Sequence, residues 1–152
     1  MLRACPDSLC RWDESILVRL LVTGASGFLG RNFLLSVDPS WTVDAVYRKD
    51  NNFPRFLARS GLKHVSPHRC DLSDEEQVCT LANVLSKRFD AILYLAADPV
   101  SVASKPAPAD DLMSGSIGFT TLLSSVHSDR LVYLSSGAVY EGLRGEVGPQ
   151  LS

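Results

Sequence analysis

The 152-residue sequence lacks a long apolar run, a Cys-x-x-Cys pair and a cluster of lysines or arginines. The first absence excludes a membrane-spanning helix, and the third leaves no obvious surface for nucleic acid. Four scattered cysteines, and an N-terminus without the apolar segment of a signal peptide, are typical of reduced thiols in the cytoplasm, where we expect the protein. The hydrophobic content of 45% excludes wholesale disorder, and the length suits one domain that needs no metal or disulfide.

Apolar runs alternate with segments of helical periodicity along most of the chain. The expected strands span residues 16–22, 43–47, 63–70, 90–97 and 131–134. The expected helices span residues 28–37, 73–88 and 110–126, with a short helix or loop at 51–60. This alternation predicts an α/β fold with a doubly wound parallel sheet, helices on both faces and the strand order 3-2-1-4-5.

Local signals refine several of these segments. Helical spacing after position 27 predicts one buried helix side, formed by Phe28, Leu29, Phe33, Leu34 and Val37. Pro67 interrupts the third strand and so places it near a sheet edge. Ser73 and Glu76 match a capping box at the start of a helix. Gly115 and Gly118 each cost their helix about 1 kcal/mol relative to alanine, which indicates another constraint there.

A glycine-rich segment, residues 23–30 (TGASGFLG), connects the first expected strand to the first expected helix. Gly24 permits a tight turn, Gly27 lets a pyrophosphate approach the backbone, and Gly30 lets the helix pack close to the sheet. Unpaired N–H groups and the positive end of the helix dipole would then face an anion. This context favours dinucleotide binding over a glycine turn that serves packing alone, and the lack of a following Gly-Lys-Ser/Thr excludes a P-loop.

Four segments in order carry a resemblance to a known family. They are TGASGFLG (23–30), CDLSD (70–74), LAA (95–97) and LSSGAVY (134–140). Over residues 18–140 the chain resembles the extended short-chain dehydrogenase/reductases, which include the NAD-dependent epimerases and dehydratases of nucleotide sugars. The resemblance implies a Rossmann fold of about five strands. The four motifs are specific for the family and say little about the substrate.

The resemblance also implies a role for the glycine-rich loop and for the segment after the third strand. The loop backbone would hold the pyrophosphate through Ser26, Gly27, Phe28 and Leu29. Asp71 would bond the adenine amino group, and Leu72 would lie beside the adenine ring. The alternative for Asp71 is a solvated loop acid that precedes the Ser73 cap.

Two further motifs would lie near the nicotinamide. Leu95, Ala96 and Ala97 would line the ribose on the nicotinamide side, although the same residues also suit an ordinary core strand. Ser136 would be the catalytic serine that bonds the reacting hydroxyl or carbonyl. The alternative for Ser136 is a hydroxyl that satisfies the backbone where its strand ends.

The end of the second strand, Tyr47-Arg48-Lys49-Asp50, bears on the choice of cofactor. An acidic side chain there bonds the ribose 2′-hydroxyl of NAD, whereas an arginine suits the 2′-phosphate of NADP. Counting from the strand puts Arg48 at this position, where a guanidinium can hold a phosphate with two hydrogen bonds and stack on adenine. We therefore favour NADP(H) over NAD(H). The alternatives are a solvated turn, and NAD binding by Asp50 if the register shifts.

The sequence departs from the family pattern in three places. Tyr94 stands where relatives often have histidine, and Gly115 stands where they often have asparagine. The family's proton donor is a tyrosine in Tyr-x-x-x-Lys, in which the lysine lowers the tyrosine pKa. None of the four tyrosines here has a lysine four residues later. Tyr140 with Arg144 is the nearest substitute, but Tyr140 already matches the serine motif.

We therefore expect the cofactor-binding portion of a larger enzyme, with the C-terminal substrate domain absent. The expected divisions are a flexible extension (1–15), the Rossmann domain (16–140) and a truncated tail (141–152). The last strand, residues 131–134, would then be an unpaired apolar edge. His64, His68 and Cys70 share strand parity but lack a fourth ligand, so we expect no metal site.

The intact enzyme would transfer hydride between a sugar carbon and nicotinamide, as an epimerase, dehydratase or reductase. Its partners would be the dinucleotide and a nucleotide-sugar substrate, with a homodimer left open. This chain alone should bind the cofactor with negligible turnover. The main alternative, favoured by the missing Tyr-x-x-x-Lys, is a non-catalytic dinucleotide-binding or regulatory module. A more distant alternative is another nucleotide-binding α/β domain.

Overall fold

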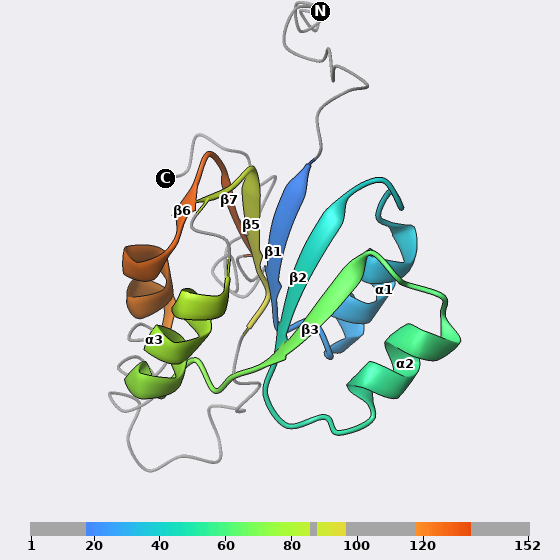
Figure 1. The fold of residues 1–152 in the computed structure, drawn as a ribbon, viewed down its shortest axis with the longest axis horizontal. Coiled ribbons are helices and arrows are strands. Elements are labelled where there is room, and N and C mark those ends of the chain that lie inside the picture. Colours follow the sequence, from blue (N-terminus) through green and yellow to red (C-terminus); the bar gives the residue numbers. More distant parts are fainter. Residues whose placement is uncertain (1–17, 86–87, 97–117, 135–152) are drawn as a thin grey trace, which may run out of the picture.

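The computed structural model describes residues 18–85, 88–96 and 118–134. The described chain is organised around a parallel sheet of five strands in the order β3-β2-β1-β5-β7 (Figure 1). These strands are β1 (Arg19–Thr23), β2 (Thr42–Tyr47), β3 (Val65–Arg69), β5 (Ala91–Tyr94) and β7 (Leu131–Tyr133). The chain adds β2 and β3 on one side of β1 and then β5 and β7 on the other, which confirms the predicted doubly wound order.

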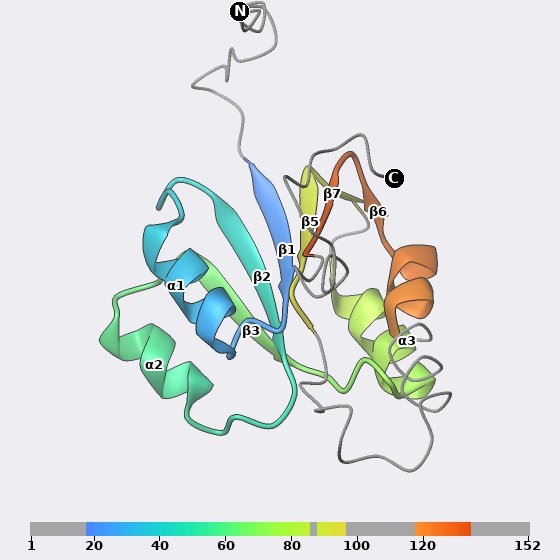
Figure 2. The ribbon, with the colours of Figure 1, turned by 180° about the vertical axis from the view of Figure 1, so that it is seen from behind.

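Helices cover both faces of this sheet. Helices α1 (Phe28–Ser36) and α2 (Phe53–Arg59) lie on one face, over the half formed by β1, β2 and β3 (Figure 2). Helix α3 (Glu75–Val84) and the helical residues 118–125 lie on the other face. Two apolar cores result, one on each side of the sheet.

The period of two along the strands divides side chains between these cores. In β1, Leu20 and Val22 pack with the α1 and α2 side, whereas Leu21 packs with the α3 side. Leu21 and Val22 are both fully buried, as expected for the central strand of a parallel sheet with two covered faces. This explains why the sequence of β1 shows an apolar run and no alternation.

The predicted buried side of α1 is wrong for its first turn. Leu34 and Val37 are buried, but Phe28 is 81% exposed and Leu29 is 56% exposed. Helical side chains tilt toward the N-terminus. Helix α1 starts beyond the end of β1, so the side chains of its first turn extend past the sheet instead of packing on it.

The start of α3 differs from the predicted capping box. Asp74 is the N-cap, and its Oδ1 accepts a hydrogen bond from the Gln77 backbone N–H at 3.1 Å. The Ser73 hydroxyl is occupied elsewhere, because it donates to Asp71 Oδ1 at 2.6 Å. The helix also ends at Val84, earlier than the predicted end near position 88.

A short parallel pair of strands was not predicted. Strand β4 (Arg88–Phe89) pairs with β6 (His127–Ser128) beside the main sheet. The Arg88 guanidinium reaches the Asp129 carboxylate at 2.8 Å and reinforces this pairing. Each strand has two residues, too few for a period-two pattern to be read from the sequence.

The remaining boundaries that fall within the described residues agree with prediction within a few residues, whereas the predicted helix start near position 110 lies outside them. Pro54 lies in the first turn of α2, and β3, which contains Pro67, is an edge strand of the described sheet. At the opposite edge, the apolar side chains of β7 and Leu134 are 43–61% exposed. The expectations for the extension 1–15 and the tail 141–152 concern residues outside those described. No helix in the described segments has the length and hydropathy to span a membrane.

Candidate functional site

An open cleft of about 470 Å³ lies at the carboxyl ends of β1, β2 and β5. Strands β1 and β5 are the neighbours at which the strand order reverses, and ligands of doubly wound sheets bind in the crevice at such a point. Its lining comes from Gly24, Ser26, Gly27, Val46, Tyr47, Arg48, Lys49, Asp50, Cys70, Asp71, Leu72, Ser73, Tyr94, Leu95, Ala96 and Gly118.

The turn after β1 is held tightly against the end of β5. Gly24 has φ of +65°, a conformation that favours glycine. A Cβ on Gly24 would also lie 2.7 Å from the Leu95 backbone carbonyl, so the position needs glycine for two separate reasons. The fully buried Thr23 hydroxyl accepts hydrogen bonds from the Leu95 and Ala96 backbone N–H groups, both at 3.2 Å. These contacts bring the two strand ends together at the cleft.

The first turn of α1 leaves backbone donors next to Gly27, which lines the cleft. Its N-cap is Gly27, and no side chain of the described residues caps the helix. The first hydrogen bond of the helix runs from the Arg31 N–H to the Gly27 carbonyl at 3.0 Å. The N–H groups of Phe28, Leu29 and Gly30 therefore lie ahead of the helical hydrogen-bond pattern, where an anion can accept from them.

Gly30 has the packing role that its spacing predicts. A Cβ at this position would lie 2.6 Å from the Cα and carbonyl oxygen of Ala25, inside the turn. Any larger residue would push α1 away from the loop. Gly30, Phe28 and Leu29 are not among the residues that line the cleft, whose lining reaches α1 at its N-cap, Gly27.

Basic residues follow the end of β2, where the sequence predicts the cofactor-selecting position. Arg48 is the first residue after the strand, and both Arg48 and Lys49 line the cleft. Asp50 lines it too, but its carboxylate already has two protein partners. One oxygen pairs with the Arg31 guanidinium, and the other accepts from the Asn52 backbone N–H at 2.9 Å.

Asp71 lies in the loop after β3 with its carboxylate partly engaged. Its Oδ1 accepts from the Ser73 hydroxyl at 2.6 Å and from the Ser73 backbone N–H at 3.1 Å. These bonds, with a smaller contribution from the positive charges of Arg48 and Lys49, lower the pKa of Asp71. Asp71 is therefore an anion at neutral pH, and among the described residues its Oδ2 has no hydrogen-bond donor.

The wall of the cleft between Asp71 and β5 is apolar. Cys70 is buried, and burial raises its pKa to about 11, so its thiol is not a nucleophile at neutral pH. Tyr94 is also buried, packs edge-on against Phe119 with ring centroids 5.0 Å apart, and has a pKa raised by burial. Tyr94 thus fills core space at the position where relatives often have histidine.

A close contact explains why Gly118, one of the two helix-weakening glycines, is present. A Cβ there would lie 2.5 Å from the Leu72 carbonyl oxygen and 3.1 Å from the Leu72 Cβ. The glycine lets the helix of residues 118–125 approach the loop that carries Asp71 and Leu72. Gly115 lies outside the described residues.

The structure brings most predicted site residues together. Those that line the cleft are Gly24, Ser26, Gly27, Arg48, Asp71, Leu72, Leu95 and Ala96. Ala97 and Ser136 lie outside the described residues, so their predicted roles stay predictions. Sequence reasoning missed Thr23 and Arg31. Thr23 could have been found as a polar residue at the end of an apolar run. No local pattern points to Arg31, because its acidic partner lies 19 residues away in the sequence.

A family model described as NAD dependent epimerase/dehydratase matches residues 20–150. The chain belongs to this family. No curated protein matches the sequence. Among solved structures, the epimerase Mth375 of Methanothermobacter thermautotrophicus superposes with a TM-score of 0.64 at 23% identity, over 80% of this chain and 36% of that one.

Two solved relatives contain a dinucleotide. UDP-glucose 4-epimerase from Bifidobacterium longum, in complex with NAD+ and UDP, has a TM-score of 0.66 at 19% identity and covers 82% of this chain and 38% of its own. A metagenomic short-chain oxidoreductase in complex with NADP has a TM-score of 0.57 at 20% identity and covers 72% and 54%. This member of the epimerase/dehydratase family thus covers between about one third and three fifths of the length of the solved structures that it matches.

The cleft of this family member fits a dinucleotide chemically. The uncapped α1 and the glycine cradle at Gly24 and Gly27 suit a diphosphate, which needs close backbone approach and several N–H donors. Arg48 and Lys49 add positive charge at the end of the cleft beside β2, and the apolar walls suit the aromatic rings of a dinucleotide. In the described part of the chain, no cluster of His, Cys, Asp and Glu could hold a metal ion.

Proposed function

We propose that this chain is the NADP(H)-binding part of an enzyme that epimerises, dehydrates or reduces a nucleotide sugar. The observation that carries the proposal is a single cleft that joins the uncapped N-terminus of α1 to Arg48 at the end of β2. An anion site alone suits any phosphate, but an arginine at the β2 end suits a second phosphate on the adenosine ribose.

Each group in the cleft has a role in this proposal. The N–H groups of residues 28–30 would donate to the diphosphate, and Gly27 would give it access to the backbone. Arg48 would hold the 2′-phosphate with two hydrogen bonds, as a guanidinium does with a phosphate. Asp71 Oδ2, which accepts no hydrogen bond from the described residues, would accept from the adenine amino group, beside Leu72.

The choice of NADP over NAD also rests on Asp50, the acidic residue two positions after Arg48 in the sequence. NAD recognition needs a carboxylate at this end of the cleft to accept from the ribose 2′-hydroxyl. Asp50 is the candidate, but its oxygens are engaged by Arg31 and by the Asn52 N–H. This engagement supports recognition of a phosphate by Arg48 instead of recognition of a hydroxyl by Asp50.

The nucleotide sugar is proposed from the family and from one solved relative. The family is named for epimerases and dehydratases, and the Bifidobacterium longum relative is a UDP-glucose 4-epimerase. When bound, the nicotinamide would exchange hydride with a sugar carbon. Within the family resemblance, Ser136 would bond the reacting oxygen, and the 152 residues alone would not turn over because they contain no Tyr-x-x-x-Lys.

A second candidate function is a non-catalytic module in which dinucleotide binding controls assembly. The same missing motif favours it. Both candidates predict dinucleotide binding by the purified chain. An assay of the longest protein that contains these residues distinguishes the two candidates. If it is an enzyme, we expect NADP(H) turnover with nucleotide sugars. If it is a binding module, we expect a change in oligomeric state on dinucleotide binding and no turnover.

The experiment that tests the cofactor assignment is a calorimetric titration of the purified chain with NADP+ and with NAD+. We expect saturable binding of both, tighter for NADP+, and a variant Arg48→Ala that loses at least tenfold for NADP+ and less for NAD+, because a charged hydrogen-bond pair contributes about 1.5–3 kcal/mol. Arg55→Ala, an exposed arginine on α2 away from the cleft lining, is the matched control. Equal losses for both dinucleotides would overturn the phosphate assignment.

A further inference from the structure

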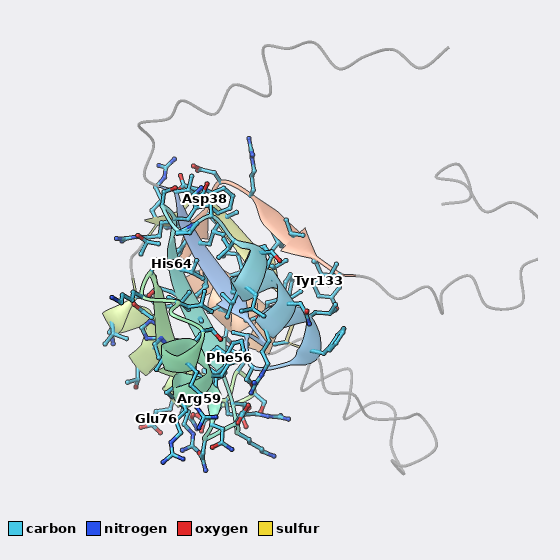
Figure 3. The ribbon with its side chains drawn as sticks, turned by 90° about the vertical axis from the view of Figure 1, so that its right-hand side faces the viewer. Asp38, Phe56, Arg59, His64, Glu76 and Tyr133 are labelled. Carbon is cyan, nitrogen blue, oxygen red and sulfur yellow. The ribbon has the colours of Figure 1, made fainter. Side chains whose placement is uncertain are left out.

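Arg31 contacts three separate segments of the chain, two of which contribute residues to the cleft lining. Its Nε donates to the Ser26 carbonyl at 2.9 Å, and its Nη2 pairs with Asp50 Oδ2. Its guanidinium carbon lies 4.5 Å from the centroid of the Phe56 ring. Phe56 lies on α2 toward the same end of the molecule as Arg59, whereas Asp38 and His64 lie toward the other end (Figure 3). One side chain therefore connects the glycine-rich loop, the segment after β2 and α2.

The contact with Ser26 fixes a peptide plane in the glycine-rich loop. The carbonyl of the Ser26–Gly27 peptide accepts from Arg31, and the N–H of the same peptide donates to the Gly24 carbonyl at 3.0 Å. Because both the carbonyl and the N–H of this peptide are hydrogen-bonded within the protein, the orientation of the peptide plane is fixed. This contact should support diphosphate binding equally for any dinucleotide.

The contact with Asp50 has a different consequence. Asp50 lines the cleft next to Arg48 and Lys49, and its side chain is 30% exposed. Left unpaired, its carboxylate would bring a negative charge to the end of the cleft where a 2′-phosphate would bind. Pairing with Arg31 removes that repulsion and also occupies an oxygen that a ribose 2′-hydroxyl could otherwise use.

We propose that Arg31 is a positioning residue that sets the preference for NADP over NAD by pairing with Asp50, so that this carboxylate neither repels a 2′-phosphate nor accepts from a 2′-hydroxyl. The inference rests on the proposed function, because it needs a dinucleotide in this cleft. It goes beyond that function because it assigns the discrimination between NADP and NAD to a residue outside the cleft lining. This residue acts through Asp50 and not by direct contact with the 2′-phosphate.

The test compares four forms of the chain: wild type, Arg31→Ala, Asp50→Asn and the double variant. For each, the Kd for NADP+ and for NAD+ is measured by calorimetry at low and high salt, with Arg55→Ala as the control for loss of one positive charge. The informative quantity is the ratio of the two Kd values, because a general loosening of the loop weakens both cofactors and leaves the ratio unchanged.

We expect Arg31→Ala to lower the preference for NADP+ by about fivefold or more at low salt, and less at high salt, where charges are screened. Asp50→Asn added to this variant should restore the preference, because the repelling carboxylate is gone. Arg31→Lys should keep the preference while weakening both cofactors, since an ammonium can pair with Asp50 but cannot keep all three contacts.

Each outcome bears on a distinct claim. If the wild type binds neither dinucleotide, the proposed function fails. If the wild type binds and Arg31→Ala weakens both cofactors by the same factor, Arg31 is only a packing residue and the inference is overturned. If Arg31→Ala does not fold, Asp50→Asn alone decides: because Arg31 already offsets the charge of Asp50, the inference predicts an unchanged or raised preference for NADP+, and a lowered preference overturns it.

Discussion

The contact between the glycine-rich loop and the end of β5 predicts a large effect for Gly24→Ala. The backbone at Gly24 has φ of +65°, and a Cβ there would lie 2.7 Å from the Leu95 carbonyl carbon and oxygen and 2.8 Å from the Ala96 nitrogen. All three are backbone atoms, so no flexible side chain can move aside. Either the turn or the end of β5 must shift to accommodate one methyl group.

The magnitude follows from two separate costs. The left-handed conformation costs an alanine about 1 kcal/mol. Forcing a methyl group into a filled space costs about 1–3 kcal/mol more. The total of about 2–4 kcal/mol is a large part of the 5–15 kcal/mol by which a domain is usually stable. For a chain of this size it corresponds to a fall in Tm of roughly 10 °C.

Gly61→Ala is a matched control because it places an alanine in the same left-handed backbone conformation without a steric clash. Gly61 has φ of +68°, and nothing lies within 4 Å of a Cβ built there. We expect it to cost about 1 kcal/mol or less, since alanine also restricts the unfolded chain. The assay is urea unfolding of the wild type and both variants, followed by circular dichroism, with NADP+ binding measured on each folded variant.

The comparison has a clear refuting outcome. If Gly24→Ala and Gly61→Ala lose the same free energy of unfolding, the steric contact with β5 contributes nothing and the close approach is incorrect. If Gly24→Ala is strongly destabilised but binds NADP+ with unchanged affinity, the turn matters for folding and not for the cleft. We expect both stability and binding to fall for Gly24→Ala, and stability alone to fall slightly for Gly61→Ala.

Three other predictions follow from the site. Thr23→Val should lose about 2–4 kcal/mol in urea unfolding, because two buried N–H groups lose their acceptor, and Thr23→Ser should recover most of it. At pH 8 iodoacetamide should label exposed Cys79 and spare Cys70, whose pKa of about 11 keeps it a thiol; equal labelling in peptide maps contradicts this. The Ser73 hydrogen bonds lower the pKa of Asp71, so their stabilisation is present at neutral pH and is lost as the pH falls below the ordinary aspartate pKa toward the lowered one. The free energy of unfolding of Ser73→Ala should therefore depend less on pH in that acidic range, as urea unfolding at a series of pH values would show.

Much of the fold could be predicted from the sequence because the strands are buried on both faces. Leu20, Leu21 and Val22 leave no polar position in the middle of β1, and such runs indicate central strands of a parallel sheet. The alternation with helical periods then fixes the layers, and the right-handed crossovers of such folds leave few topologies. The position of Arg48 follows by counting from β2, because the strand ends one residue earlier.

Other features depend on competition or on long-range contacts that a local pattern does not show. Ser73 does not cap α3 because its hydroxyl bonds Asp71, which leaves the cap to Asp74. Phe28 has the correct helical spacing for burial, but it lies on the turn that extends beyond the sheet. Arg31 is an ordinary helical residue in the sequence, and its partner Asp50 is brought close only by the fold.

The most direct test of the account is a titration of the isotopically labelled chain with NADP+, followed through the backbone amide resonances. The account predicts saturable shifts that begin at Ser26 to Gly30, together with shifts at Arg48, Asp71 and Leu95. Titration with NAD+ should move the same loop amides and leave Arg48 less affected. Saturable shifts that avoid residues 26–30, or no shifts at millimolar NADP+, would contradict the claim that the loop after β1 holds a diphosphate.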